Sequence, residues 1–299
     1  MSFREWLLVV FVGCLFGSSF LLVVVVSREL GPLSIAGGRA LVAALACWVF
    51  MLLTRKQLPR DPLLILKLCL LGVFSYGLPF VLAPISQAHI STGLMAIINL
   101  MLPVSTGAIS HFWPGGERAT PLKAIGIFTG LGGALILATP TLTSGDETQT
   151  WAVALVLCSN LIFAVSFNIT RSFAETEASV IATLAMTGAA LSAVPAALWV
   201  EGVPHVAHLA TWGAWIALGL FPTALSFQIM YFMLPRVGAT NFSTNAYIAP
   251  IVAILLGISL LGEVILPVQV LGMVVVLAGL LLMDGRLIRG ARRLLVANR

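Results

Sequence analysis

The sequence predicts an all-α membrane protein whose ten transmembrane helices form an inverted five-plus-five repeat around a central cavity. Three observations predict this fold. Hydrophobic residues make up 60% of the chain and charged residues only 9%, whereas soluble domains carry about 25% charged residues. Apolar segments of membrane-crossing length follow one another with short connections. The second half of the sequence repeats features of the first half.

Ten apolar segments are long enough to cross a hydrocarbon core about 30 Å thick. The first segment resembles a signal peptide, but it lacks a small-residue cleavage site and has a counterpart later in the chain. We therefore expect it to remain as a span. In order, the predicted spans are 6–26, 32–53, 63–85, 90–112, 121–140, 151–170, 178–199, 212–234, 240–261 and 266–283.

Positive charges predict the orientation of these spans. If the N-terminus is cytoplasmic, Arg28 lies on the outer side, Arg39 lies within a span, and the other fourteen of the 16 Lys and Arg residues lie on the cytoplasmic side. Both termini are therefore expected to be cytoplasmic, in a multi-pass protein of the plasma (bacterial inner) membrane. Because these charges lie in connections and in a basic cytoplasmic tail at 286–299, they do not indicate a nucleic-acid partner.

An internal repeat supports this topology. Residues 1–140 hold the first five spans, and residues 151–285 hold the other five. An odd number of spans per half reverses the second half in the membrane, as in transporters built from inverted repeats. At a spacing of 147 residues, and later of 146, the matching positions are Phe16/Phe163, Phe20/Phe167, Gly72/Gly219, Phe80/Phe227, Pro103/Pro250, Gly116/Gly262, Glu117/Glu263 and Gly126/Gly272.

The pattern Gly-Glu-x-x-x-Pro-x-x-x-x-Gly occurs at 116–126 and again at 262–272. With the ten spans and the repeat, it resembles the drug/metabolite transporter superfamily in its EamA-type branch, so that each half corresponds to one EamA-type repeat. The sequence is also similar to the YddG-type amino-acid exporters of that superfamily. The resemblance implies a basket of helices around a cavity formed largely by spans one, three, four, six, eight and nine. It also implies exported amino acids or similar metabolites as cargo. Glu117 and Glu263 lie at loop ends, where we expect them to cap helices rather than bind cargo.

Polar and aromatic side chains inside the spans are candidates for the cavity lining, because a polar group facing lipid is costly. Asn160, Phe163 and Phe167 share one face of span six at helical spacing. Interhelical hydrogen bonding is the alternative for any single polar residue. A neutral ring of aromatic and amide groups suits a cargo such as a neutral amino acid. The candidate substrate-binding residues are Phe20, Tyr76, Phe80, Asn99, Asn160, Phe163, Phe167, Gln228 and Asn245.

Pro103 and Pro250 lie in the middle of spans four and nine, where a proline bends the helix and frees a carbonyl. They are candidate hinges for alternating access, or static kinks that shape the bundle. Arg39 is the basic residue that lies well inside a span. It could anchor a substrate carboxylate, extend to the outer surface, or tie span two to neighbouring carbonyls, and we favour a structural role.

Acidic residues are missing from the interior of every span, which argues against carboxylate-mediated proton antiport and favours facilitated diffusion or exchange. The sequence has no H-E-x-x-H or G-x-S-x-G motif, so we expect no enzyme. Its four cysteines lie in apolar runs without a C-x-x-C pair, so we expect no metal or cofactor. Gly126, Gly130 and Gly133 allow span five to approach span ten or a second copy, which leaves monomer and homodimer both open.

The sequence therefore predicts a secondary transporter that exports neutral, including aromatic, amino acids or related small metabolites by alternating access. Its expected partners are a small-molecule substrate and the lipid bilayer. The alternatives are a multidrug or other small-metabolite exporter of the same superfamily, or a channel-like facilitator.

Overall fold

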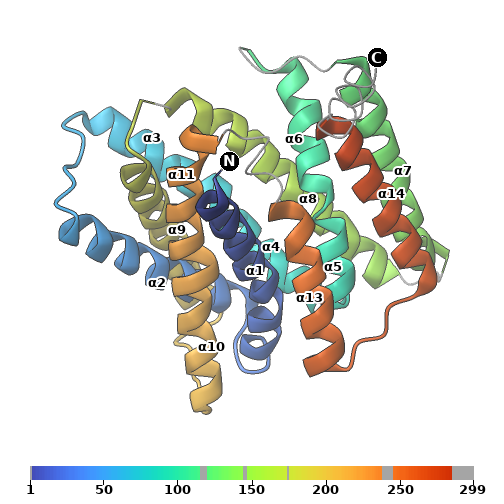
Figure 1. The fold of residues 1–299 in the computed structure, drawn as a ribbon. Coiled ribbons are helices and arrows are strands. Elements are labelled where there is room, and N and C mark those ends of the chain that lie inside the picture. Colours follow the sequence, from blue (N-terminus) through green and yellow to red (C-terminus); the bar gives the residue numbers. More distant parts are fainter. Residues whose placement is uncertain (1, 115–119, 144–146, 174, 238–244, 285–299) are drawn as a thin grey trace.

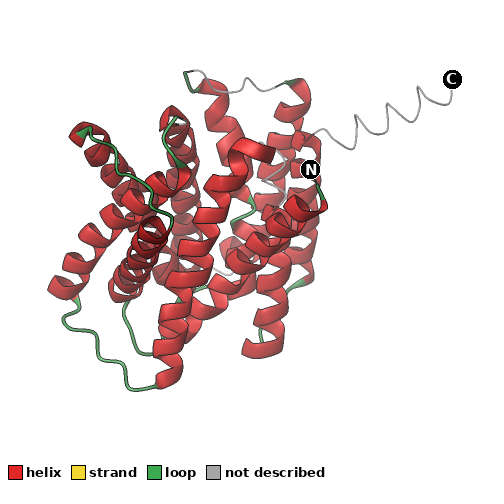
Figure 2. Ribbon diagram, turned by 60° about the vertical axis from the view of Figure 1, so that its left-hand side comes forward, coloured by secondary structure: helices red, strands yellow, loops and turns green. Residues whose placement is uncertain are grey.

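The computed structural model describes residues 2–114, 120–143, 147–173, 175–237 and 245–284. All regular structure in these ranges is helical (Figure 2). The predicted tail at 286–299 and Glu117 lie outside the described residues. In chain order the elements in Figure 1 are α1 (Phe3–Val26), α2 (Pro32–Leu53), α3 (Pro62–Gly72), the π-helical η1 (Val73–Gly77), α4 (Leu78–Gln87), α5 (Thr92–Ile98), α6 (Met101–Phe112), α7 (Pro121–Thr143), α8 (Glu147–Thr170), the short 3-10 helix η2 (Arg171–Phe173), α9 (Ala178–Val200), α10 (Leu209–Gly219), the π-helical η3 (Leu220–Leu225), α11 (Ser226–Val237), α13 (Asn245–Leu261) and α14 (Pro267–Asp284).

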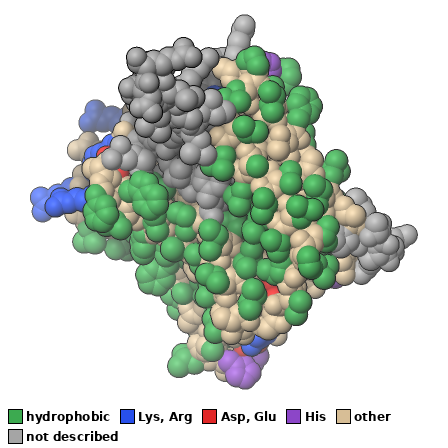
Figure 3. Space-filling model, turned by 45° about the vertical axis from the view of Figure 1, so that its right-hand side comes forward, with side chains coloured by type: hydrophobic (Ala, Val, Ile, Leu, Met, Phe, Trp, Pro, Cys, Tyr) green, Lys and Arg blue, Asp and Glu red, His purple; other side chains and the backbone are tan. Residues whose placement is uncertain are grey.

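Much of the protein surface is apolar. The side chains of Leu45, Leu135 and Trp199 are 58%, 67% and 91% exposed, and such a surface is suited to contact with lipid. In the view of Figure 3, hydrophobic side chains cover the middle of the molecule, and most of the charged and histidine side chains lie toward its edges. Seven helical stretches of the described chain are long and apolar enough to cross a membrane: Phe3–Val26, Pro32–Leu53, Pro62–Gln87, Thr92–Phe112, Gln149–Thr170, Ala178–Val200 and Leu209–Met233.

The predicted multi-pass membrane protein is thereby confirmed. The other three predicted spans, 121–140, 240–261 and 266–283, fall on α7, α13 and α14, and residues 240–244 of the second span lie outside the described residues. The apolar helices Ile248–Leu261 and Pro267–Gly279 occupy two of these positions. The count of ten spans stays a prediction.

Two of the membrane-crossing stretches contain a π-helical segment in their middle. In one, α3, η1 and α4 follow without interruption, and in the other α10, η3 and α11 do so. Pro222 lies inside η3, and Pro79 lies two residues after η1. Proline lacks an N–H, and its ring crowds the carbonyl four residues earlier, so the helix departs from α geometry nearby. Pro222 has no N–H to donate to Leu218 O. This carbonyl instead accepts a hydrogen bond from Thr223 Oγ1 at 2.7 Å. The two π segments start 147 residues apart, which is the spacing of the sequence repeat.

Helices from the two halves of the chain pack against each other throughout the bundle. The helix α2 lies along α9, and α7 lies along α14. The helix α1 packs on α13, while α8 packs on α6. Likewise α3 packs on α9, and α10 packs on α2 (Figure 1). The largest buried cluster draws its side chains from α1, α2, α3, η1, α4, α9, η3 and α11, so the core lies between the two halves.

Glycines bring α7 and α14 into close contact. A Cβ atom added at Gly279 would lie 2.6 Å from Gly130 N and 2.7 Å from Gly126 O. A Cβ atom added at Gly133 would lie 2.7 Å from Val276 N. The predicted contact between spans five and ten is therefore confirmed.

We expect Gly279→Ala to lower the melting temperature of the purified protein. Its new methyl group would meet the backbone of α7, and such overpacking costs about 1–3 kcal/mol of folding free energy. Gly132→Ala is the matched control, because a Cβ atom at Gly132 has no neighbour within 4 Å. In thermal unfolding in detergent, the melting temperature of Gly279→Ala should therefore be well below that of Gly132→Ala. Equal melting temperatures would contradict the close contact.

Three glutamates in the connections cap helices that are distant in sequence. Glu263 accepts hydrogen bonds from the backbone N–H groups of Thr92 and Gly93, at 2.7 and 2.9 Å, at the start of α5. Glu201 accepts from Leu33 N and Ser34 N at the start of α2, and Glu29 reaches the start of α10. Carboxylates at helix N-termini bond orphan N–H groups and interact favourably with the helix dipole. The predicted capping role of Glu263 is confirmed.

Glu29, between α1 and α2, accepts hydrogen bonds from the Thr211 hydroxyl, from Ala207 N at 2.6 Å and from His208 N at 3.3 Å. These bonds, led by that of Thr211, lower the pKa of Glu29 from 4.5 to about 2. A lowered pKa in the folded state means that the carboxylate stabilises the fold fully above pH 4.5. That stabilisation is lost as the pH falls toward 2.

We therefore expect Glu29→Gln to melt below the wild type at pH 7, with a difference that shrinks as the pH falls below about 4.5. Melting curves across this pH range provide the measurement. Glu175→Gln removes an exposed carboxylate and should leave the melting temperature unchanged. A Glu29→Gln difference that stays constant at low pH would contradict the role of the ionised carboxylate.

Candidate substrate site

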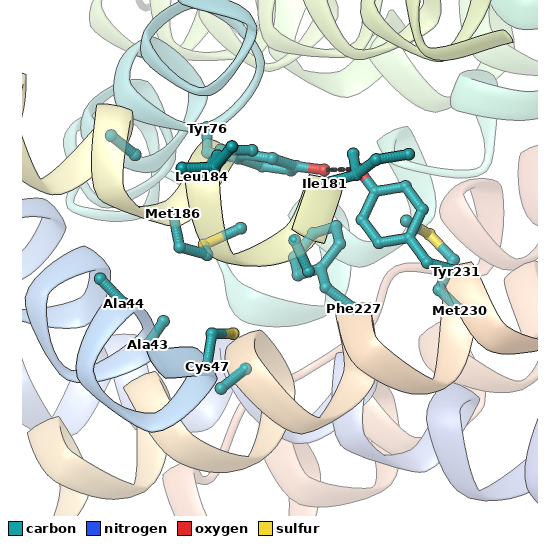
Figure 4. Close-up of a cluster of buried hydrophobic side chains, with 14 of the residues drawn as sticks. Ala43, Ala44, Cys47, Tyr76, Ile181, Leu184, Met186, Phe227, Met230 and Tyr231 are labelled. Atoms are coloured by element: carbon teal, nitrogen blue, oxygen red, sulfur yellow. Dashed lines mark hydrogen bonds between the residues drawn. The ribbon is translucent and has the colours of Figure 1, made fainter. Parts of the chain in front are cut away.

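Aromatic side chains from five elements meet in the core between the two halves. Tyr76 lies at their centre and is 2% exposed. Its hydroxyl lies 2.6 Å from the hydroxyl of Tyr231, and its ring meets the edge of Phe227 at a centroid distance of 4.7 Å. Figure 4 shows the two tyrosines pointing toward one another with Phe227 beside them. The aromatic cluster, as we call it below, consists of Phe16 of α1, Tyr76 of η1, Phe80 of α4, Phe163 and Phe167 of α8, and Phe227 and Tyr231 of α11.

The structure brings four of the predicted substrate-binding residues together. The ring centroid of Tyr76 lies 5.8 Å from that of Phe80 and 6.2 Å from that of Phe163. Phe163 in turn packs on Phe167 at 6.4 Å. Because the four residues come from η1, α4 and α8, they join segments that are far apart in the sequence.

The other predicted residues lie around this cluster. Phe20 packs instead in a neighbouring cluster with side chains of α5 and α8. Gln228 is half-buried on α11, and Asn245 is half-buried as the first residue of α13. Asn99 and Asn160 lie at the break between α5 and α6.

That break gives Asn160 a specific structural partner. The helix α5 ends at Ile98, and Leu102 N donates to Asn99 O at 3.0 Å as α6 begins. Asn160 Nδ2, on α8, donates to Ile98 O at 3.1 Å and is 1% exposed. Its amide thus bonds a carbonyl at the interruption, which is the interhelical hydrogen bond considered as an alternative. Pro103 lies three residues into α6, directly after the break, and Pro250 is buried within α13.

Arg39 is buried beside the aromatic cluster. It is 8% exposed on α2, its Nε donates to Thr223 Oγ1 at 2.7 Å, and its guanidinium lies 3.9 Å from the ring centroid of Phe80. Thr223 also donates to Leu218 O, the carbonyl that Pro222 cannot bond. The widened helix at η3 therefore supplies the acceptor for Arg39. Among the described residues, no carboxylate pairs with the guanidinium.

Several buried polar atoms near the cluster have no hydrogen-bond partner among the described residues. They include Asn160 Oδ1, Gln228 Nε2 and Ser75 Oγ, where Ser75 is adjacent to Tyr76 in η1. A buried polar group without a partner costs about 1–3 kcal/mol. Such atoms are available to a polar ligand or to water.

The predicted list of substrate-binding residues omits three residues of the aromatic cluster, Phe16, Phe227 and Tyr231, although the repeat pointed to two of them. Phe227 and Phe16 are the partners of Phe80 and Phe163 at the spacing of 147 residues. Tyr231 lies one helical turn beyond Phe227, but its bond to Tyr76 depends on tertiary structure. The inward position of Arg39 likewise depended on where α2 lies relative to η3.

An apolar groove with a volume of about 620 Å³ opens on the surface between α3, η1 and α8. Its lining includes the exposed side chains of Lys67, Phe74 and Leu161. None of the predicted site residues lines it, so it is separate from the aromatic cluster. An apolar surface groove of this kind is suited to a lipid acyl chain.

The fold and the site together define a polytopic helical membrane protein with an aromatic and polar centre between its halves. The family model described as "EamA-like transporter family" matches residues 4–139 and 150–283. This chain belongs to the EamA-like transporter family, which forms part of the drug/metabolite transporter superfamily.

Named relatives are similar over much of the chain. The "Uncharacterized inner membrane transporter YedA" of Escherichia coli K12 is 27% identical, over 94% of this chain and 92% of its own. The "Probable terminal-alkyne amino-acid exporter" of Streptantibioticus cattleyicolor is 27% identical over 69% of this chain and 68% of its own. The "Aromatic amino acid exporter YddG" of Ancylobacter novellus is 26% identical over 53% of this chain and 59% of its own.

A solved crystal structure shares the fold. It is 18% identical to this chain and aligns with a TM-score of 0.68, over 92% of this chain and 94% of its own. This likeness bears on the fold alone.

Proposed function

We propose that this transporter exports neutral, including aromatic, amino acids or related small metabolites across the plasma membrane by alternating access. The observation that carries the proposal is the aromatic cluster, which lies between helices of both halves, near buried amide and hydroxyl atoms that have no partner among the described residues. Rings of this kind bind an apolar side chain, and the polar atoms bind the ends of an amino acid. Cargo would enter by separating side chains that pack together in this conformation.

We also propose that the bundle is an inverted repeat of ten spans, with residues 1–140 and 151–285 as its halves and both termini cytoplasmic. The helix pairs support this arrangement, since α1 on α13 corresponds to α8 on α6, and α3 on α9 corresponds to α10 on α2. The matching π segments support it further. In such a protein the two halves rock about a central site and expose it to each side in turn. Pro103 and Pro250 are the proposed hinges.

The names of two relatives support the proposal that the cargo is an amino acid. These names specify export of amino acids, one of terminal-alkyne and one of aromatic amino acids. The aromatic rings of this chain's core fit cargo of the same class. A multidrug or other small-metabolite exporter is the second candidate, favoured by the largely apolar character of the cluster, and a channel-like facilitator is the third. A homodimer and a monomer both fit the proposal.

A substrate screen in proteoliposomes tests the proposed cargo. The purified full chain is reconstituted, and uptake of labelled neutral amino acids is compared with that of cationic drugs in matched vesicles. We expect phenylalanine and other large neutral amino acids to be transported without an imposed pH gradient, because the described acidic residues lie at helix ends and in connections. Transport confined to drugs would support the second candidate, and a strict need for a pH gradient would contradict this coupling.

A further inference from the structure

The guanidinium of Arg39 is a buried positive charge without a negative partner among the described residues. We propose that it binds the carboxylate of the transported amino acid, so that cargo must carry an anionic group beside its apolar side chain. This inference rests on the proposed function and specifies its substrate class. It assigns the recognition of charge to α2, while the aromatic cluster binds the apolar part.

The bonds of Arg39 leave one side of the guanidinium available. Among the described residues only Nε is engaged, through Thr223 Oγ1 at 2.7 Å, and the guanidinium carbon lies 3.9 Å from the centroid of the Phe80 ring. The Nη atoms donate to no described residue. The residue as a whole is 8% exposed. A guanidinium edge with two free donors matches the two oxygens of a carboxylate.

The position of Arg39 bears on each of the three roles considered from the sequence. It does not extend to the membrane surface, since the residue is 8% exposed and its guanidinium lies on Phe80. Nor does it bond a backbone carbonyl among the described residues, because its acceptor is the Thr223 hydroxyl. A tie between α2 and η3 remains, but a neutral donor would serve that purpose without the cost of burying a charge.

An arginine remains charged at neutral pH, and a buried charge is tolerated when it is paired. In this protein the counterion would arrive with the cargo. Phe80 connects the two parts of the site directly, because its ring contacts both Arg39 and Tyr76. A carboxylate bound at Arg39 therefore lies beside the rings that would hold an aromatic side chain.

Competition between phenylalanine and phenylalaninamide tests this role, since the amide lacks the carboxylate. Both compounds compete against uptake of labelled phenylalanine in proteoliposomes of the full chain. In the wild type we expect phenylalanine to inhibit uptake at a concentration about tenfold or more below that of the amide. The reason is that a site built for a polar group rejects an analogue that lacks it. In Arg39→Gln we expect the preference to disappear through weaker competition by phenylalanine, and Arg39→Lys should restore part of it.

Two further variants separate this role from a structural one. Thr223→Val removes the acceptor of Nε but keeps the charge, so we expect the preference for the carboxylate to persist. If Arg39 only tied α2 to η3, Thr223→Val and Arg39→Gln would slow transport alike and leave the preference unchanged. Arg28→Gln, which removes an exposed arginine of the α1–α2 connection, should behave as the wild type.

Each outcome either supports or overturns the inference. Wild-type transport of phenylalanine with an unchanged preference in Arg39→Gln would overturn the role of Arg39 and leave the proposed function intact. No phenylalanine transport by the wild type would instead contradict the proposed function. If Arg39→Gln does not fold, the thermal stability of the wild type decides the matter. Phenylalanine should raise its melting temperature more than the amide, and equal stabilisation would overturn the inference.

Discussion

Replacement of Tyr76 by alanine is expected to reduce phenylalanine transport by about tenfold or more, because the change opens the centre of the proposed binding site. Tyr76 contacts the rings of Phe80, Phe163 and Phe227 and bonds the hydroxyl of Tyr231. The loss of such a buried aromatic side chain also costs about 3–5 kcal/mol of stability. Initial rates of uptake in proteoliposomes, at matched amounts of folded protein, provide the measurement.

Two variants separate binding from folding at this position. Phe74→Ala removes a ring from the same segment, η1, but its side chain is 58% exposed on the outer surface of the bundle, so we expect near wild-type transport. Tyr76→Phe keeps the ring and removes the hydroxyl, at a cost of about 0.5–1.5 kcal/mol for the lost hydrogen bond to Tyr231. It should retain most of the transport. Equal transport by Tyr76→Ala and Phe74→Ala would contradict a binding role for the aromatic cluster.

The second large effect is expected at the break between α5 and α6. Asn160→Ala removes the donor that bonds Ile98 O. We expect it to lower the free energy of unfolding by about 1–3 kcal/mol, because the carbonyl remains buried without a partner. Transport should also slow at saturating phenylalanine, since the broken helix lies next to the proposed hinge at Pro103. Thermal unfolding and uptake rates measure the two effects separately.

Cys158→Ala is the matched control for this change. Cys158 lies two residues from Asn160 on α8 and is exposed, so its replacement should alter neither stability nor transport. A stable, fully active Asn160→Ala protein would show that the bond to Ile98 O is dispensable. It would also remove Asn160 from the proposed site.

Much of the fold could be predicted from hydropathy, because crossing a bilayer requires a long apolar helix whatever its neighbours are. The span predicted at 32–53 coincides with α2, and the span at 178–199 ends one residue before α9 does. The span predicted at 90–112 is instead two helices with a break at Asn99 and Leu100. Hydropathy carries no signal for such a break, since both parts are apolar and the freed carbonyl is bonded by the distant Asn160.

The candidate site could be predicted only in part, for a related reason. Helical periodicity placed Phe163 and Phe167 on one face, and both lie in the aromatic cluster. The contacts of Tyr76 with Tyr231 and of Arg39 with Thr223 join residues 155 and 184 positions apart. These contacts follow from how α2, η1 and the second half pack together, which a single sequence does not encode locally. The sequence left three roles open for Arg39. Its burial against Phe80 excludes the role in which the side chain extends to the outer surface.

Counterflow of labelled phenylalanine tests the central claim, that the two halves form a carrier for neutral amino acids, most directly. Proteoliposomes of the full chain are loaded with unlabelled phenylalanine and diluted into medium with a trace of the labelled compound, without a pH gradient. A carrier with alternating access should accumulate label transiently above its equilibrium level, with an initial rate that saturates with external phenylalanine. Flux that is neither saturable nor accelerated by internal phenylalanine, or that equals the flux in protein-free vesicles, would contradict the claim.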